Sequence, residues 1–116
     1  MKDNILGVRA EAFALRVIEL SRFLSCTKNE YIISKQIVRS GTSIGANIAE
    51  SEFAQSKADF VSKLYISLKE ANETRYWLRL LRKSQYMSSE EIIPMESECS
   101  ELISMLVSSL KTLKRA

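Results

Sequence analysis

The chain has 116 residues, of which 46% are hydrophobic and 27% are charged, and it contains three glycines and one proline. This length suits a single domain over residues 1–116, and so few chain-breaking residues argue against a β-rich fold, which needs many turns. The net charge of +3 permits contact with nucleic acid without requiring it.

Histidine is absent from the sequence, which excludes the commonest general base and every Ser-His or Cys-His nucleophile pair. The two cysteines, Cys26 and Cys99, are far apart, and neither has a second cysteine nearby. We interpret both as small core residues and expect neither a metal nor a cofactor. Charged residues interrupt each apolar stretch before it reaches the roughly 20 residues that span a bilayer, so we expect a cytoplasmic protein without membrane contact.

Apolar residues spaced three and four apart predict a first helix over about residues 4–25. Its inward positions are Leu6, Ala10, Phe13, Val17, Leu20 and Leu24. A second helix is predicted over about residues 30–53, with one face formed by Ile33, Ile37, Gly41, Ile44 and Ile48. Three small residues four apart predict close packing of another helix against this one. They are Gly41, Gly45 and Ala49.

Capping motifs mark the start of the other two helices. Ser56 and Asp59 begin a third helix that runs to about Gln85, and its inward positions are Phe60, Leu64, Ala71, Leu78 and Leu81. Ser88 and Glu91 begin a fourth helix, and its inward positions are Ile92, Cys99, Leu102, Leu106 and Leu113. Linkers of about two to five residues make sequential helices antiparallel, so we predict an all-α, up-down-up-down four-helix bundle.

A polar stripe lies beside the glycines on the second helix. Its residues, spaced four, four and three apart, are Arg39, Ser43, Asn47 and Glu50. One interpretation is a buried network with Glu70, Glu73 or Thr74 of the third helix, which sets the register of the helices or lines an assembly interface. The other interpretation is an ordinary solvated face.

The densest positive charge lies near the end of the third helix, since residues 55–87 carry seven basic and three acidic side chains. In an up-down bundle this end lies near the end of the first helix and the start of the second. The resulting basic pole comprises Arg22, Lys28, Lys35, Arg75, Arg79, Arg82 and Lys83, of which the last four are expected to share a face. Because aromatic residues lie nearby, the pole has the chemistry to hold a phosphate backbone and stack a base. A solvated basic face is the alternative.

Tyr76 and Trp77 are adjacent on a helix, so both cannot face the same core. One of them, together with Phe53, is a candidate for contact between copies of the chain. Further apolar surface off the main stripes comes from Val38, Tyr65 and Ile66. We therefore expect a homo-oligomer.

Three runs of sequence, residues 33–50, 56–60 and 69–78, resemble the bacterial four-helix-bundle family of rRNA intervening-sequence-encoded proteins. That family also includes the accessory proteins of diversity-generating retroelements. The resemblance implies a bundle that assembles into a ring, with a homopentamer favoured, and no enzymatic activity. For the accessory branch it also implies binding of nucleic acid and a reverse transcriptase through a basic surface. The family's motif residues in this chain are Arg39, Ser43, Asn47, Glu50, Glu70, Glu73 and Trp77.

Three functions are weighed on these grounds. The leading hypothesis is a non-enzymatic, ring-forming adaptor that contacts RNA or DNA through the basic pole. The second is a protein-binding scaffold that uses the surfaces of Trp77 and Phe53 and has no affinity for nucleic acid. The third is an enzyme that uses Glu50 with Glu70 or Glu73, which requires these carboxylates to line an open cleft.

Overall fold

The computed structural model describes residues 4–115, and these residues form four α-helices. The helices are α1 (Ile5–Thr27), α2 (Ile33–Ser51), α3 (Lys57–Lys83) and α4 (Ser89–Arg115). Each predicted helix boundary lies within three residues of the observed one. Within the described part of the chain, no helix combines the length and apolarity that a membrane span needs.

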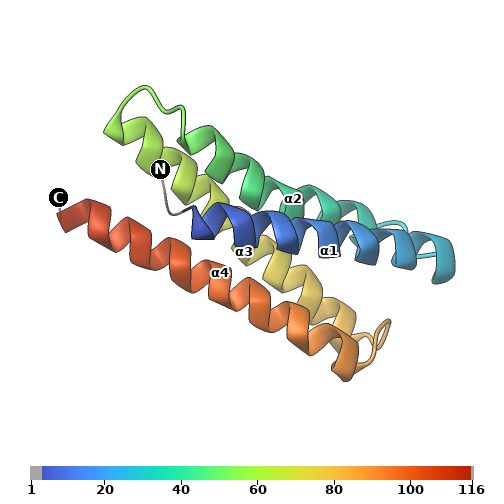
Figure 1. The fold of residues 1–116 in the computed structure, drawn as a ribbon. Coiled ribbons are helices and arrows are strands. Elements are labelled where there is room, and N and C mark those ends of the chain that lie inside the picture. The colour runs from blue at the N-terminus through green and yellow to red at the C-terminus, as the bar shows by residue number, and fades with distance from the viewer. Residues whose placement is uncertain (1–3, 116) are drawn as a thin grey trace.

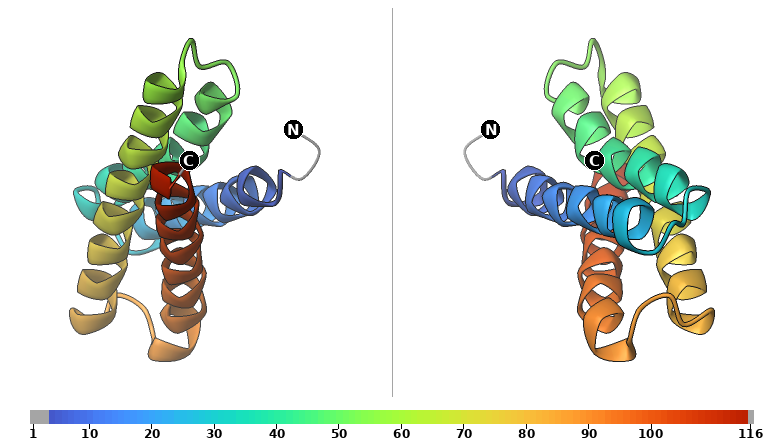
Figure 2. Two further views of the ribbon diagram at one scale, coloured as in Figure 1. Left: turned by 90° about the vertical axis from the view of Figure 1, so that its left-hand side faces the viewer. Right: turned by 90° about the vertical axis from the view of Figure 1, so that its right-hand side faces the viewer.

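The helices form an up-down-up-down bundle, as predicted, in which each helix runs antiparallel to the next (Figure 1). The bundle measures 46 × 22 × 20 Å. Helix α2 packs between α1 and α3, and α3 packs between α2 and α4. Of the four pairs of neighbouring helices, α1 and α4 contact each other least, and Figure 2 shows α1 crossing α4 at a wide angle. The contact between the first and last helices is therefore the least extensive of the four in the bundle.

One hydrophobic core runs the length of the bundle. Predicted inward residues from all four helices are fully buried, among them Phe13, Ile44, Leu78 and Leu102. Four other predicted inward residues are partly buried against this core, namely Leu6, Ile33, Phe60 and Leu113. The core prediction is wrong for Cys26, which is exposed. Nine helical positions separate Cys26 from buried Val17, so the two side chains point in opposite directions.

Both predicted capping motifs are present. The Ser56 hydroxyl accepts a hydrogen bond from the Asp59 backbone N–H at 3.1 Å, and this bond opens α3. The Ser88 hydroxyl accepts from the Glu91 N–H at 3.3 Å, and the Glu91 carboxylate accepts from the Ser88 N–H at 3.4 Å. These bonds satisfy backbone donors that the first helical turn leaves free.

Helix α2 begins with a cap that the sequence analysis did not identify. The buried carboxylate of Glu30 accepts hydrogen bonds from the backbone N–H groups of Ile32, Ile33 and Ser34, at 3.2, 2.9 and 2.8 Å. Glu30 was predicted to lie inside the helix, whereas the helix starts three residues later. Its negative charge also suits the positive end of the helix dipole.

The predicted row of small residues packs against α1 over only part of its length. A Cβ atom added to Gly41 would lie 2.7 Å from a methyl group of Val17, so any larger residue must displace the Val17 side chain. At Gly45 the distance to the Ala10 methyl group would be 3.5 Å, which is ordinary contact. Ala49 is exposed, contrary to the predicted close packing, because α1 diverges from α2 near this end.

The α2–α3 joint is built around three buried hydroxyl groups. Ser40, Ser67 and Thr74 are all fully buried between the two helices. The Ser67 hydroxyl donates to the Ile44 carbonyl at 2.8 Å, and the Ser40 and Thr74 hydroxyl oxygens share a hydrogen bond of 2.8 Å. Small hydrogen-bonded side chains let α2 and α3 approach closely without leaving buried polar groups unpaired.

Candidate nucleic-acid interface

The basic pole is the end of the bundle where α1 and α3 end and α2 and α4 begin (Figure 1). Lys28 and Arg82 line one surface depression together with Tyr86, so the ends of α1 and α3 meet there as expected. Lys28 has an exposed side chain, and so do four other predicted contact residues, namely Arg22, Lys35, Arg79 and Lys83. Within residues 4–114 these four cations form no ion pair.

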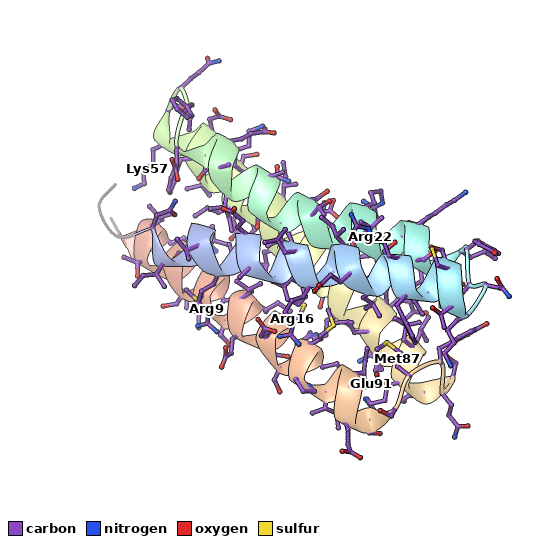
Figure 3. All side chains as sticks on the ribbon, turned by 45° about the vertical axis from the view of Figure 1, so that its right-hand side comes forward. Arg9, Arg16, Arg22, Lys57, Met87 and Glu91 are labelled. Atoms are coloured by element: carbon purple, nitrogen blue, oxygen red, sulfur yellow. The ribbon has the colours of Figure 1, made fainter. Side chains whose placement is uncertain are left out.

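The cations of the pole do not form a single surface. Figure 3 shows Arg9 and Arg16 on the side of α1 that faces α4, whereas Arg22 lies on the other side of this helix. Arg22 is therefore separated from the α3–α4 side of the pole by the body of α1.

Two of the four cations that were predicted to share one face of α3 do not share it. Arg82 turns toward α4, where its Nε atom lies 2.7 Å from a carboxylate oxygen of Glu96, and this hydrogen bond raises the pKa of Arg82. Arg75 is half-buried and donates to the side-chain oxygen of Asn72 at 2.9 Å. Of the four, Arg79 and Lys83 have exposed side chains and form no ion pair within residues 4–114, so they carry the free positive charge of α3 at this end.

The polar stripe of α2 joins α3 at its two ends. Arg39 forms ion pairs with Glu70, at 3.2 Å, and with Glu73. At the other end Glu50 pairs with Lys63 at 3.1 Å. The intervening residues do not cross to α3, because the Ser43 hydroxyl donates to the carbonyl of Arg39 and the Asn47 amide to that of Ser43.

Trp77 completes the cluster around Arg39. Its indole N–H donates to the Glu73 carboxylate at 3.0 Å, and its ring is partly buried against the core. The hydrogen bond from Arg39, supported by that from Trp77, lowers the pKa of Glu73, and it raises the pKa of Arg39 in turn. Glu70 and Glu73 are thus ion-paired with Arg39, and Glu50 is ion-paired with Lys63. The arrangement thus removes the acid/base pair that the enzyme hypothesis required.

A second apolar stripe, on the outer face of α1, was missed by the sequence analysis. Ile5, Val8 and Leu15 expose 60, 66 and 58% of their surface, and Ala12 lies exposed between them. Their spacing of three, four and three residues is a helical stripe like that of the core, but on the opposite side of α1.

Phe53 is 88% exposed in the loop after α2. Of the adjacent aromatic pair, Tyr76 is the exposed member.

The comparisons with known proteins cover nearly the whole chain. A family model described as 23S rRNA-intervening sequence protein matches residues 2–108. A crystal structure of a protein with unknown function from the S23 ribosomal protein family of Bacteroides thetaiotaomicron is 49% identical to this chain, with a TM-score of 0.92. That similarity covers 96% of this chain and 99% of the other. A search of the curated proteins gave no match.

Proposed function

We propose that this chain, which belongs to the family of 23S rRNA-intervening sequence proteins, is a non-enzymatic, homo-oligomeric adaptor that binds RNA or DNA through its basic pole. The observation that carries the proposal is the set of exposed cations at this pole that form no ion pair within residues 4–114. Free cations release the counterions of a phosphate backbone when they bind it, whereas an arginine already held by a carboxylate contributes much less.

The homo-oligomeric part of the proposal is supported by the outer face of α1. An aliphatic stripe of three exposed large residues and Ala12 is unusual on a surface that stays in water, and such stripes mark contacts with other protein. A ring of five copies is the assembly that the resemblance implies. In a ring whose bundles run along its symmetry axis, the basic poles of all copies would face the same way, which would multiply their affinity for one strand.

The test is fluorescence anisotropy with labelled RNA and DNA at two salt concentrations, with the mass of the assembly measured by light scattering. Binding should weaken steeply with salt, and replacing Arg79 and Lys83 by Gln should reduce the slope of log affinity against log salt by about 1.5. The matched control removes two exposed lysines at the opposite end, Lys57 and Lys111, in the same way.

If the Lys57 and Lys111 control reduced the salt slope equally, binding would depend on the overall charge of the protein, and this would contradict binding through the basic pole. Absence of binding even at low salt would overturn the nucleic-acid part of the proposal. In that case a protein-binding scaffold is the better function, and the exposed α1 stripe and Phe53 are the surfaces that favour it.

A further inference from the structure

We infer that the outer face of α3 is a binding site for single-stranded RNA or DNA, on which Tyr65 and Tyr76 stack against bases. This inference rests on the proposed function and specifies which form of nucleic acid the protein takes. The observation that supports it is the order of the exposed residues along α3.

Six exposed residues follow one another along this face at alternating spacings of four and three residues. They are Tyr65, Lys69, Asn72, Tyr76, Arg79 and Lys83, which we call the α3 stripe. At about 100° per residue this spacing keeps all six within an arc of about 80°, and the stripe is about 27 Å long. Two aromatic and three cationic side chains thus lie along one face of the helix.

The acidic residues of α3 lie away from the stripe. Glu70 and Glu73 turn toward α2 and are occupied by Arg39, and Asp59 accepts from the backbone N–H of Gln55 at the helix start. The three cations of the stripe form no ion pair within residues 4–114. The stripe is therefore complementary in charge to a phosphate backbone along its whole length.

The ring of Tyr76 is held in place from two directions. The Arg79 guanidinium lies over it, 5.7 Å from the ring centroid, and the Trp77 ring meets it edge to face at 5.2 Å. A ring that is already ordered loses little side-chain entropy when a base stacks on it. The planar guanidinium of Arg79 offers a second surface for stacking beside it.

This chemistry fits a single strand better than a duplex. In a duplex the faces of the bases are covered by their neighbours, so tyrosine rings on a straight helix cannot reach them. In a single strand the bases are free to turn toward the protein while the phosphates contact the lysines. The two tyrosines lie 39 and 45% exposed, about 17 Å apart along the helix, which is room for the strand to engage both.

A protein partner fits the stripe less well. Lysine is depleted in protein interfaces, whereas it supplies two of the six positions here. The chain also has a separate aliphatic face on α1 that suits protein contact better.

The experiment compares labelled single-stranded 12-nucleotide RNA and DNA with duplexes of the same length, using anisotropy and the full-length protein. Single strands should bind at least about tenfold more tightly than duplexes. Replacing Tyr65 and Tyr76 by Ala should weaken single-strand binding by about tenfold or more without changing the salt slope, because no charge is lost. Replacing them by Phe should leave binding nearly unchanged, since the stacking ring remains. The control is Tyr31→Ala, which removes an exposed tyrosine outside the stripe.

The other possible outcomes would each contradict the inference or the proposed function. Duplexes that bind as tightly as single strands, or tyrosine variants that bind like the parent protein, would overturn the inference and leave the proposed function standing. Failure to bind any nucleic acid would overturn the proposed function itself. Tyrosine variants that keep their thermal unfolding transition but lose assembly mass would show that the stripe contacts another copy of the chain.

Discussion

The α2–α3 joint and the α1–α4 joint hold their helices together by different means. Between α2 and α3, small hydroxyl residues are fully buried, and each hydroxyl has a hydrogen-bond partner. Between α1 and α4, the helices cross at a wide angle and are linked by two ion pairs, Arg9–Glu101 and Arg16–Glu98 (Figures 2 and 3). Both arginine side chains are 42% exposed.

This difference indicates which pair of helices contributes more to the stability of the bundle. Exposed ion pairs contribute about 0–1 kcal/mol each, because water competes for the charges. A buried hydrogen bond contributes a similar free energy to stability. Substitutions at a buried group cost more, because they leave a buried polar group unpaired or force a larger side chain into a filled space. We therefore expect α2 and α3, which carry the basic pole and the α3 stripe, to be the rigid half of the molecule.

The largest predicted effect is the difference in thiol reactivity between Cys99 and Cys26. Cys99 lies buried in α4 and its thiol donates to the Ala71 carbonyl of α3 at 3.2 Å, and burial raises its pKa to about 12. Because the thiolate is the reactive form, Cys99 should react with a maleimide only when α4 leaves the bundle, at least about a thousandfold more slowly than exposed Cys26. Mass spectrometry of the labelled protein over time measures both rates. Fast labelling of Cys99 in the folded protein would mean that α4 is much less firmly held than the structure indicates.

Overfilling the α2–α3 joint should give the largest loss of stability among single substitutions. Ser67→Leu adds a bulky side chain where no surface is exposed, so the free energy of unfolding should fall by about 2–3 kcal/mol. The same change at exposed Ser62 on α3 should alter it by less than about 0.5 kcal/mol. Urea unfolding followed by circular dichroism measures both. Equal effects at the two positions would contradict close packing at this joint.

Removing one buried hydroxyl should cost less than overfilling. Thr74→Val preserves shape but leaves the Ser40 hydroxyl without this partner, and we expect a loss of about 1 kcal/mol. Adding Ser40→Ala should cost less than Ser40→Ala does in the parent protein, because the two groups depend on each other. Strict additivity in this double-mutant cycle would show that the two hydroxyls do not interact.

Neutralising an ion pair of the α1–α4 joint should have the smallest effect. The combination of Arg9→Met with Glu101→Gln should change the free energy of unfolding by less than about 1 kcal/mol, since both side chains are largely exposed. The same variant should nevertheless label faster at Cys99, because α4 is released more often. A loss above about 2 kcal/mol would show that this joint is as important as the α2–α3 joint.

Helix number, helix limits and most of the core were predictable because their causes are local. The Ser56 and Ser88 caps act within one turn, and the spacing of apolar residues identifies the buried face of each helix. The α1 stripe has the same kind of spacing, but its residues were not predicted to form a second apolar face of that helix. Glu30 was missed because a glutamate cap has no distinctive sequence signature, unlike Ser or Asp at the N-cap position.

By itself, the sequence determined four amphipathic helices and their antiparallel order, because these depend on periodicity, capping residues and short linkers. The motifs at residues 33–50, 56–60 and 69–78 indicated the family. Tertiary structure decided which charges remain free. Arg79 and Arg82 are equivalent in the sequence, yet Arg82 is neutralised by Glu96, fourteen residues away on α4, while Arg79 faces solvent over Tyr76. The same holds for Glu73, whose partner Arg39 lies on another helix. Coulomb interactions depend on distance in space, so the free and the neutralised cations could be distinguished only after the helices were packed.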